Sequence, residues 1–385
     1  MPDKKAVLIL GAGIGGITLA TRLRRLLPRA HGITLVDQEA THVFAPSLLW
    51  LMTGDRTVGQ ITRPLGALAE RGIEVIHGTV ERIDPGAKAV WIDGRAFGAE
   101  HLVIALGATL APERVPGLAE AGHNLYDLAG AQTLRDARLA VSEGRIVVLI
   151  AALPFKCPAA PNEAAMLLEY DYRRRGVRKR VQLDLYTPEP GPMPVAGQAV
   201  SRALRQMIEA KGIGYHPEHA VTAVDPARRR IRFANGAETD FALLAYVPPH
   251  AAPKVVQDAG LCGESGWVPV DRETLQTRFP GVRALGDVAG IGLSIGRPLP
   301  KAGVLAHNEA EVLAHNIARE ITGRGAPRSF GGEGSCFIET GDGRAGFGSG
   351  NFYAEPAPQI RLRAPSSMLH WGKIAYEKYW LWRWL

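Results

Sequence analysis

The chain has 385 residues, of which 46% are hydrophobic and 22% charged. This length accommodates two to three domains, and the balance is ordinary for a globular protein. Three cysteines without a Cys-x-x-Cys pair argue against a disulfide-stapled secreted fold and against a zinc ribbon. The formal net charge of +7 suits an anionic lipid surface, a nucleic acid or a charged substrate without deciding among them.

The N-terminal segment predicts a strand–turn–helix–strand unit. Residues 6–10 are a continuous apolar run, typical of a strand buried on both faces. A helix is expected over residues 16–27 and a second strand over residues 33–36, which Asp37 follows. The intervening Gly-x-Gly-x-x-Gly turn consists of Gly11, Gly13 and Gly16. This context predicts a bound dinucleotide, with its pyrophosphate at the helix N-terminus and a ribose hydroxyl on Asp37.

Later segments extend this plan. Residues 101–106 form a buried strand that ends at Gly107, a second α/β unit occupies residues 144–249, and residues 281–325 return to the first domain. We expect an α/β fold with two Rossmann-like dinucleotide-binding domains, the first of them discontinuous, and a separate C-terminal region. The expected limits are 1–113 with 270–325, 114–269, and 326–385.

The second α/β unit lacks the turn that a second nucleotide needs. A buried strand at 146–151 leads towards a helix at 160–174 through a segment without glycine, in which Cys157 lies between Lys156 and Pro158. Backbone approach to a pyrophosphate requires the glycines. The sequence therefore predicts one bound dinucleotide and one redox-active sulfur.

Two segments favour FAD over NAD in the first domain. The strand at 282–285 ends in Gly286 and Asp287, which resemble the Gly-Asp pair of two-dinucleotide flavoproteins, where the Asp binds the ribityl chain. Residues 102–108 resemble the strand-to-glycine segment that leaves the FAD domain in those enzymes. The order and spacing of these segments favour an FAD-binding domain over a chance similarity.

Taken together, the motifs resemble the sulfide:quinone oxidoreductase and flavocytochrome c sulfide dehydrogenase family of two-dinucleotide-domain flavoproteins. The resemblance covers nearly the whole chain and is most specific at 155–163, 286–287, 300–303 and 335–337. It implies FAD-dependent oxidation of sulfide to sulfane sulfur, with electrons passed to a membrane quinone.

The resemblance also implies roles for single residues. Cys157 and Cys336 would form the redox disulfide beside the flavin, and Glu163 would be the acid that manages protons. Lys301 would lie near the pyrimidine end of the flavin, where positive charge stabilises the reduced ring. From their Pro and Gly neighbours, both cysteines are expected in loops.

The segment 42–47 departs from the pattern of some family members. It contains Pro46, an expected FAD contact, but no cysteine that could bond the flavin. We therefore expect non-covalent FAD. The remaining thiol, Cys262, is interpreted as structural.

The last 15 residues combine aromatic and basic side chains. They contain Trp371, Trp380, Trp382, Trp384, Tyr376, Tyr379, Lys373, Lys378 and Arg383. This composition suits a membrane interface, and no run of 18 apolar residues predicts a spanning helix. We expect peripheral attachment, at the cytoplasmic face because the N-terminus does not resemble a signal peptide. A docking helix in a homo-oligomer or domain contact is the alternative.

Other features are interpreted more simply. The basic run 173–180 lacks interleaved aromatics, so it indicates a solvated helix end, and nucleic acid is not expected as a partner. His216 and His219 are interpreted as surface residues, and no metal site is expected. Three rival functions stay open: a type II NADH:quinone dehydrogenase, the flavoprotein subunit of a flavocytochrome, and a non-catalytic flavin-binding scaffold.

Overall fold

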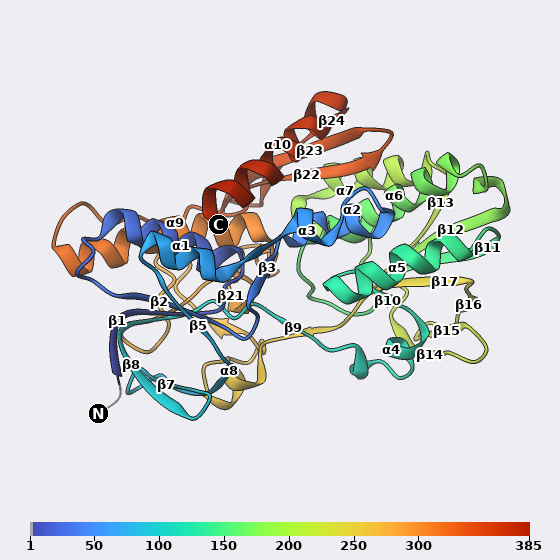
Figure 1. The fold of residues 1–385 in the computed structure, drawn as a ribbon. Helices are drawn as coiled ribbons and strands as arrows, with labels where there is room; N and C mark the ends of the chain where they lie inside the picture. The colour runs from blue at the N-terminus through green and yellow to red at the C-terminus, as the bar shows by residue number, and fades with distance from the viewer. Residues whose placement is uncertain (1–2) are drawn as a thin grey trace.

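The computed structural model describes residues 3–385 and contains two α/β lobes, across which the C-terminal sheet and helix lie (Figure 1). The first lobe is built on a seven-stranded sheet in the order β5-β2-β1-β8-β7-β6, with β20 paired to β8. Because β20 lies far along the chain, this lobe is discontinuous, as predicted. Its strands are β1 (Asp3–Leu10), β2 (Ile33–Asp37), β5 (Glu74–His77), β6 (Val80–Asp84), β7 (Ala89–Ile92), β8 (Arg95–Ile104) and β20 (Val282–Ala284).

Two long helices pack together on one face of this sheet. The N-terminal end of α1 (Ile14–Leu26) meets the start of α9 (Gly303–Thr322), where a side chain at Gly303 would collide with Ile14. The core beneath them consists of apolar side chains from β1, β2 and β8 that are inaccessible to solvent. On the other face, α8 (Lys254–Asp258) packs Val256 into the first lobe's core, although the expected domain limit assigns it to the second domain.

The second lobe is a five-stranded parallel sheet in the order β10-β17-β11-β12-β13. Its apolar run at β11 is buried on both faces, as the sequence predicted. Its elements are β10 (His123–Asn124), β11 (Gly144–Ile150), β12 (Val181–Tyr186), β13 (Ile213–His216), β17 (Leu243–Val247), α4 (Leu118–Ala121), α5 (Leu128–Ala140), α6 (Ala160–Arg174) and α7 (Gln198–Glu209).

Several short strands complete the chain. Two small antiparallel sheets were not anticipated from the sequence: β14-β15-β16 on the second lobe, and β22-β23-β24 in the C-terminal region. Short pairs join β9 to β18, β19 to β21 and β3 to β4. Their bounds are β3 (Thr41–Val43), β4 (Thr62–Pro64), β9 (Thr109–Leu110), β14 (Val221–Asp225), β15 (Arg230–Phe233), β16 (Glu238–Asp240), β18 (His250–Ala251), β19 (Val268–Pro269), β21 (Ala289–Gly290), β22 (Glu333–Gly341), β23 (Arg344–Asn351) and β24 (Gln359–Ser366).

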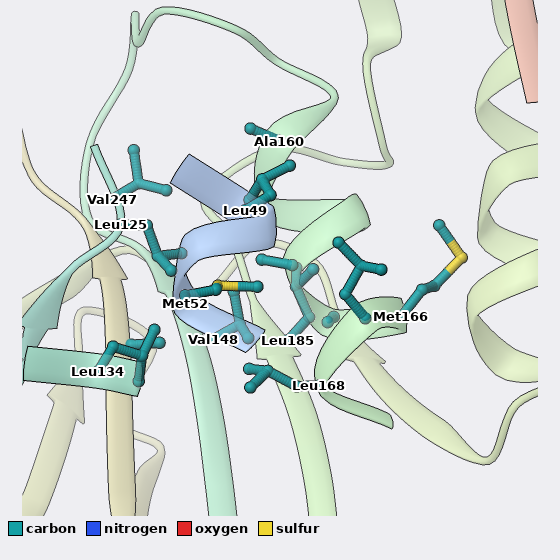
Figure 2. Close-up of a cluster of buried hydrophobic side chains, with 14 of the residues drawn as sticks. Leu49, Met52, Leu125, Leu134, Val148, Ala160, Met166, Leu168, Leu185 and Val247 are labelled. Carbon is teal, nitrogen blue, oxygen red and sulfur yellow. The ribbon is translucent and has the colours of Figure 1, made fainter. Parts of the chain in front are cut away.

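The first lobe sends a short excursion into the second. Helix α2 (Leu48–Thr53), followed by α3 (Val58–Ile61), leaves the first lobe. Figure 2 shows Leu49 and Met52 of α2 among side chains of the second lobe such as Leu125 and Val148. Burial of several large apolar side chains at ~25 cal/mol per Å² makes this a strong attachment between the lobes.

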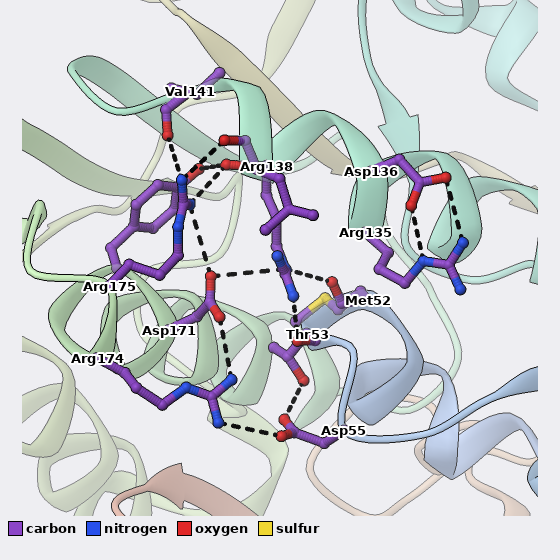
Figure 3. A network of polar contacts seen from close by, with 12 residues as sticks. Met52, Thr53, Asp55, Arg135, Asp136, Arg138, Val141, Asp171, Arg174 and Arg175 are labelled. Atoms are coloured by element: carbon purple, nitrogen blue, oxygen red, sulfur yellow. Dashed lines mark hydrogen bonds and ion pairs between the residues drawn. The ribbon is translucent and has the colours of Figure 1, made fainter.

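Polar contacts reinforce the same attachment. The buried Arg138 of α5 donates to the carbonyl oxygens of Met52 (2.8 Å) and Thr53 at the end of α2, and its Nε lies 3.6 Å from an Asp171 carboxylate oxygen (Figure 3). The basic run is therefore partly structural rather than a solvated end, because Arg175 likewise donates to the Arg138 carbonyl (2.8 Å). In this way the last carbonyl groups of α2 and α5, which lack partners within their own helices, accept hydrogen bonds from arginine side chains.

The final helix, α10 (Ser367–Trp384), is amphipathic in a way the sequence pattern obscured. Its inner face buries Lys373, Glu377, Trp380, Leu381 and Trp384 against the rest of the chain. Its outer face leaves Trp371 65% and Trp382 74% exposed. The tail is therefore part of the core on one side. Trp380 and Trp384 pack against the rest of the chain, as in the alternative of a domain contact, and the outer aromatic residues are the ones left for a membrane interface. None of the helices described between residues 3 and 385 is long and apolar enough to cross a membrane.

Candidate active site

The first turn has the geometry of a phosphate cradle. Gly11 has φ of +102°, and a side chain there would press on the Ala105 carbonyl; one at Gly16 would press on the Gly11 carbonyl. A side chain at Gly13, by contrast, meets nothing within 4 Å. Two glycines therefore permit the tight turn, while the third leaves space at the N-terminus of α1, where an anion is stabilised.

Side chains hold the turn from both sides. Asp37 accepts from the Ala12 amide (2.6 Å), and the His42 Nδ1 lies 3.0 Å from the Ala12 carbonyl oxygen. Burial lowers the pKa of His42 to about 4. Its Nε2 is buried without a hydrogen-bond partner among the described residues, and its ring centre lies 5.0 Å from that of Trp380. Pro46 follows in a short 3₁₀ turn (Ala45–Ser47), and its predicted FAD contact stays a prediction.

The Gly-Asp pair offers a second polar atom for the cofactor. Gly286, with φ of +73°, donates its amide to the buried Glu309 of α9 (2.6 Å). The adjacent Asp287 has one buried carboxylate oxygen that no described residue binds, and burial raises its pKa. Such an orphan acceptor is costly unless a ligand hydroxyl reaches it. Gly107, also at positive φ, ends the segment after β8 as expected.

Cys157 lies in the loop between β11 and α6, as predicted, with φ of +49°. Its amide donates to the Lys301 carbonyl (2.6 Å), and its own carbonyl accepts from the Tyr126 hydroxyl (3.1 Å). These contacts fix an unfavourable backbone conformation. They also bring the loop of the second lobe against the Lys301 segment of the first.

Cys336 lies on strand β22, not in the loop that we expected. The glycine-rich neighbourhood that suggested a loop instead supplies small residues to a sheet, since Gly348 of β23 is the partner of Cys336 in the register. Both thiols are free and both line one cavity of about 310 Å³. The structure therefore brings together two cysteines that lie 179 positions apart in the sequence.

The environment of the thiols opposes their ionisation. Burial, with a smaller contribution from the Glu163 charge, raises the pKa of Cys157 to about 12. Burial and the neighbouring Cys157 raise the pKa of Cys336 further. The Lys373 ammonium acts in the opposite direction on both thiols. A buried cysteine pair of this kind is a poor thiolate at neutral pH when reduced.

Glu163 is held in a buried ion pair that the sequence did not reveal. Its Oε1 accepts from the Lys373 ammonium and from the Glu339 amide, both at 2.8 Å. The charges of Glu163 and Glu339 outweigh the effect of burial and raise the pKa of Lys373. The Glu339 carboxylate in turn lies 3.0 Å from Nδ1 of the partly exposed His370. Lys373 was expected at a membrane surface, but it is buried in an ion pair with Glu163 and its charge acts on both thiols.

Lys301 lies at the junction of the two lobes. Its ammonium donates to the carbonyls of Asp287 (2.6 Å) and Ala289 (3.0 Å) and stands 3.5 Å from the centre of the Trp267 ring. Burial lowers its pKa to about 8. The ammonium therefore lies beside Asp287, which fits the predicted place near the flavin.

One sequence interpretation outside this site needs correction. His216 stacks on Tyr186 with ring centres 4.2 Å apart and lies 2.9 Å from the buried Asp184, and His219 contacts the same Tyr186 ring. They form an aromatic cluster rather than free surface residues. No group of three potential metal-ligating side chains occurs in the part of the chain that the structure describes.

Comparison with known protein families identifies the class of this protein. Residues 5–310 match the family of pyridine nucleotide-disulphide oxidoreductases, and the chain belongs to this family. Its cofactor is FAD, and the open space at Gly13 and the orphan oxygen of Asp287 fit that group. The expected α/β flavoprotein fold is confirmed.

Particular relatives narrow the comparison. The chain is 29% identical to the sulfide-quinone reductase of Aquifex aeolicus, over 98% of this chain and 91% of that protein. It is 26% identical to the mitochondrial sulfide:quinone oxidoreductase of Mus musculus, over 91% and 79% of the two chains. The crystal structure of the Aquifex aeolicus enzyme superposes with a TM-score of 0.89 at 27% identity, covering 99% of this chain and 91% of that one. The predicted resemblance is thus confirmed.

Proposed function

We propose that the protein oxidises sulfide to sulfane sulfur through a Cys157–Cys336 disulfide and passes the electrons through FAD to a quinone. The observation that carries this proposal is the cavity shared by both thiols. It lies where a second nucleotide turn would stand, and it adjoins the Lys301 segment of the FAD lobe. The named relatives support the same substrates.

The sulfur chemistry balances within this cavity. Sulfide attacks one cysteine of the disulfide, so a new S–S bond forms while the Cys157–Cys336 bond breaks and leaves a thiolate. The sulfide sulfur is oxidised by two electrons and the disulfide is reduced by two. The Lys373 ammonium, which lowers the thiol pKa values, stabilises that leaving thiolate.

The chain's own residues hold the cofactor non-covalently. Gly13 and the N-terminus of α1 would receive the pyrophosphate, Asp37 would accept from a ribose hydroxyl and Asp287 from the ribityl chain. When bound, FAD supplies the two-electron step between the thiols and the quinone. Lys301 places positive charge beside it. No cysteine in the segment 42–47 is present to bond it.

Attachment to a membrane surface belongs to the same proposal. The outer face of α10 presents Met368, Trp371, Tyr379 and Trp382 together with the exposed Lys378. Aromatic rings with nearby cations favour the headgroup region of an anionic bilayer. Peripheral binding there, at the cytoplasmic face, would place the bilayer beside α10. A lipid-soluble quinone could then reach the protein from the membrane on this side.

Reduction of a water-soluble quinone by sulfide tests the catalytic proposal. The purified protein should be yellow, should release FAD on acid precipitation, and should be bleached rapidly by sulfide under anaerobic conditions. NADH should bleach it slowly or not at all, because the second turn lacks glycines. Rapid bleaching by NADH with none by sulfide would overturn the proposal in favour of an NADH dehydrogenase.

Flotation with liposomes tests the membrane proposal separately. The double variant Trp371→Ser/Trp382→Ser should lose binding to vesicles that contain anionic lipid, by roughly tenfold or more. Leu139→Ser, which removes an exposed apolar side chain from α5, is the matched control. Equal flotation of the double variant and the wild type would assign the outer face of α10 to an oligomer contact instead.

A further inference from the structure

The cavity that the two thiols line also contains a carboxyl group that no sequence motif marks. Glu189 lies between β12 and α7, is 7% exposed, and lines the cavity. Its amide donates to the Thr187 hydroxyl and its carbonyl accepts from the Glu218 amide, both at 3.1 Å. Its carboxylate has no hydrogen bond or ion pair with another residue of the described chain. The main chain is thus fixed while the side chain stays available to a molecule in the cavity.

The carboxylate of Glu163, unlike that of Glu189, is not available to a molecule in the cavity. Its Oε1 is already engaged by the Lys373 ammonium and the Glu339 amide, and Glu163 is not among the residues that line the cavity. The other charged residues that line it are Arg297 and Lys301, and Lys301 is bound to carbonyls. Glu189 is therefore the carboxylate that a molecule in the cavity meets, since no other Asp or Glu of the described residues lines it.

The walls of the cavity determine which form of sulfide enters. They are almost entirely apolar, with Phe155, Leu299 and Ile338 among them. Transfer of an unpaired anion into such walls is costly, so neutral hydrogen sulfide enters more readily than hydrosulfide. The exposed Arg297 and Leu153 mark the end of the cavity that is open to solvent. A neutral substrate must then lose a proton inside before it can attack a disulfide.

We propose that Glu189 accepts this proton. The inference rests on the proposed function and deepens it. One S–H bond of hydrogen sulfide breaks and the proton passes to the Glu189 carboxylate. The hydrosulfide then attacks the disulfide, forming one S–S bond and breaking the Cys157–Cys336 bond, with a two-electron reduction of the disulfide. The proton leaves towards solvent past Arg297.

The electrostatic surroundings suit this role. Burial raises the pKa of Glu189 to about 7, and the Arg297 charge partly opposes that increase. A general base works best when its pKa lies near the working pH. The titratable groups that line the same cavity are Arg297, Lys301 and the thiols of Cys157 and Cys336. Two buried hydroxyl groups outside the lining, those of Tyr215 and Tyr126, also sense the Glu189 charge.

Anaerobic stopped-flow reduction of the FAD-loaded protein by sulfide, across pH 5.5 to 9, tests the inference. In the wild type the rate should be bell-shaped with pH, because it needs neutral hydrogen sulfide and ionised Glu189 together. Glu189→Gln should lower the neutral-pH rate by about 100-fold. Its rate should instead rise with pH to a plateau that follows hydrosulfide in solution. Glu189→Asp should restore part of the bell.

Control variants separate the inference from loss of charge or fold. Glu264→Gln, which removes an exposed carboxylate, should leave the profile unchanged. Arg297→Gln should move the acidic limb to higher pH, because loss of the positive charge raises the pKa of Glu189. If Glu189→Gln does not fold, the Arg297→Gln profile decides: a shift supports the inference, and an unshifted limb overturns it.

Two outcomes would refute the inference while leaving the proposed function intact. One is a wild-type rate and profile in Glu189→Gln. The other is the plateau profile appearing in Glu163→Gln while Glu189→Gln stays bell-shaped. A wild-type protein that sulfide never bleaches would instead refute the proposed function itself, so the two failures are distinguishable.

Discussion

The two strand–turn–helix units, β1–α1 and β11–α6, have the same plan but opposite chemistry. In the first, Gly11 and Gly16 allow the backbone to close on itself, and Gly13 leaves space at a helix N-terminus. In the second, the turn carries Phe155 and Cys157 into a mostly apolar cavity. The topology sets where a turn stands relative to its sheet, whereas the turn residues decide whether it receives a phosphate or presents a sulfur.

Removing the sulfur should have the largest effect. Cys157→Ser and Cys336→Ser should each lower sulfide-driven quinone reduction by about 1,000-fold, equivalent to ~4 kcal/mol of transition-state stabilisation. FAD content should not change, because neither thiol belongs to the first turn. Cys262→Ser, from the core of the first lobe, is the control. Near-normal turnover in either of the first two variants would end the disulfide mechanism.

The buried ion pair behind the second turn comes next. Lys373→Met leaves Glu163 buried without its cation, so we expect a loss of about 3–5 kcal/mol in the free energy of unfolding. The double variant Glu163→Gln/Lys373→Met should recover much of it. Urea denaturation of the three proteins measures both values. A single variant as stable as wild type would mean that solvent reaches Glu163.

Two glycine variants distinguish the loss of cofactor space from the distortion of the backbone in the first turn. Gly13→Ala should fold normally but bind FAD about 10- to 100-fold more weakly, or ~1.4–2.8 kcal/mol, because its methyl group enters the cofactor space. Gly16→Ala should destabilise the apoprotein itself, since its methyl group meets the Gly11 carbonyl. FAD titration of apoprotein and its thermal unfolding report the two effects. The comparison fails if both variants lose stability equally.

The smallest predicted effect is a pH dependence at the first turn. Burial lowers the pKa of His42 to about 4 from 6.5, so its contribution to stability is present above pH 6.5 and is lost as the pH falls. Between pH 7 and pH 5.5 the loss should be roughly 1 kcal/mol.

Over this range, urea denaturation should show the stability difference between wild type and His42→Asn shifting by roughly 1 kcal/mol in favour of the variant. Glu189 and Glu309, whose pKa values are raised to about 7, act in the opposite direction. They are present in both proteins, and therefore cancel in the comparison. His77→Asn, from an exposed position, is the control. Identical slopes for His42→Asn and wild type would mean that His42 is already hydrated.

The sequence predicted those elements whose patterns lie within a short stretch of the chain. The apolar run of β1, the glycine turn and the limits of α6 follow from periodicity within a short window, and the structure has them nearly where expected. The pairing of Cys157 with Cys336 came from family resemblance, because no local pattern connects residues so far apart. Its role as a redox pair stays a prediction, although both thiols line one cavity.

The missed features depend on contacts between distant segments. In the sequence, Lys373 resembles a basic residue at a membrane interface because tryptophans lie nearby. Only the docking of α10 places its ammonium beside Glu163. The charged and aromatic residues of α10 alternate between two faces that are both rich in tryptophan, so composition could not separate them. Glu189 carries no motif, and its buried, unbound carboxyl emerges only when the cavity is formed around it.

The position of Lys373, far after Glu163 in the chain, has a consequence for biosynthesis. Domains generally fold as they emerge from the ribosome, N-terminal parts first. Glu163 is therefore synthesised 210 residues before its cation, and α10 must dock before the ion pair beside the thiols can form. The same docking brings Trp380 and Trp384 into the core of the first lobe. A nonsense mutation just before residue 373 should thus leave Glu163 unpaired and that core incomplete, so that the shortened protein is both less stable and without competent sulfur chemistry.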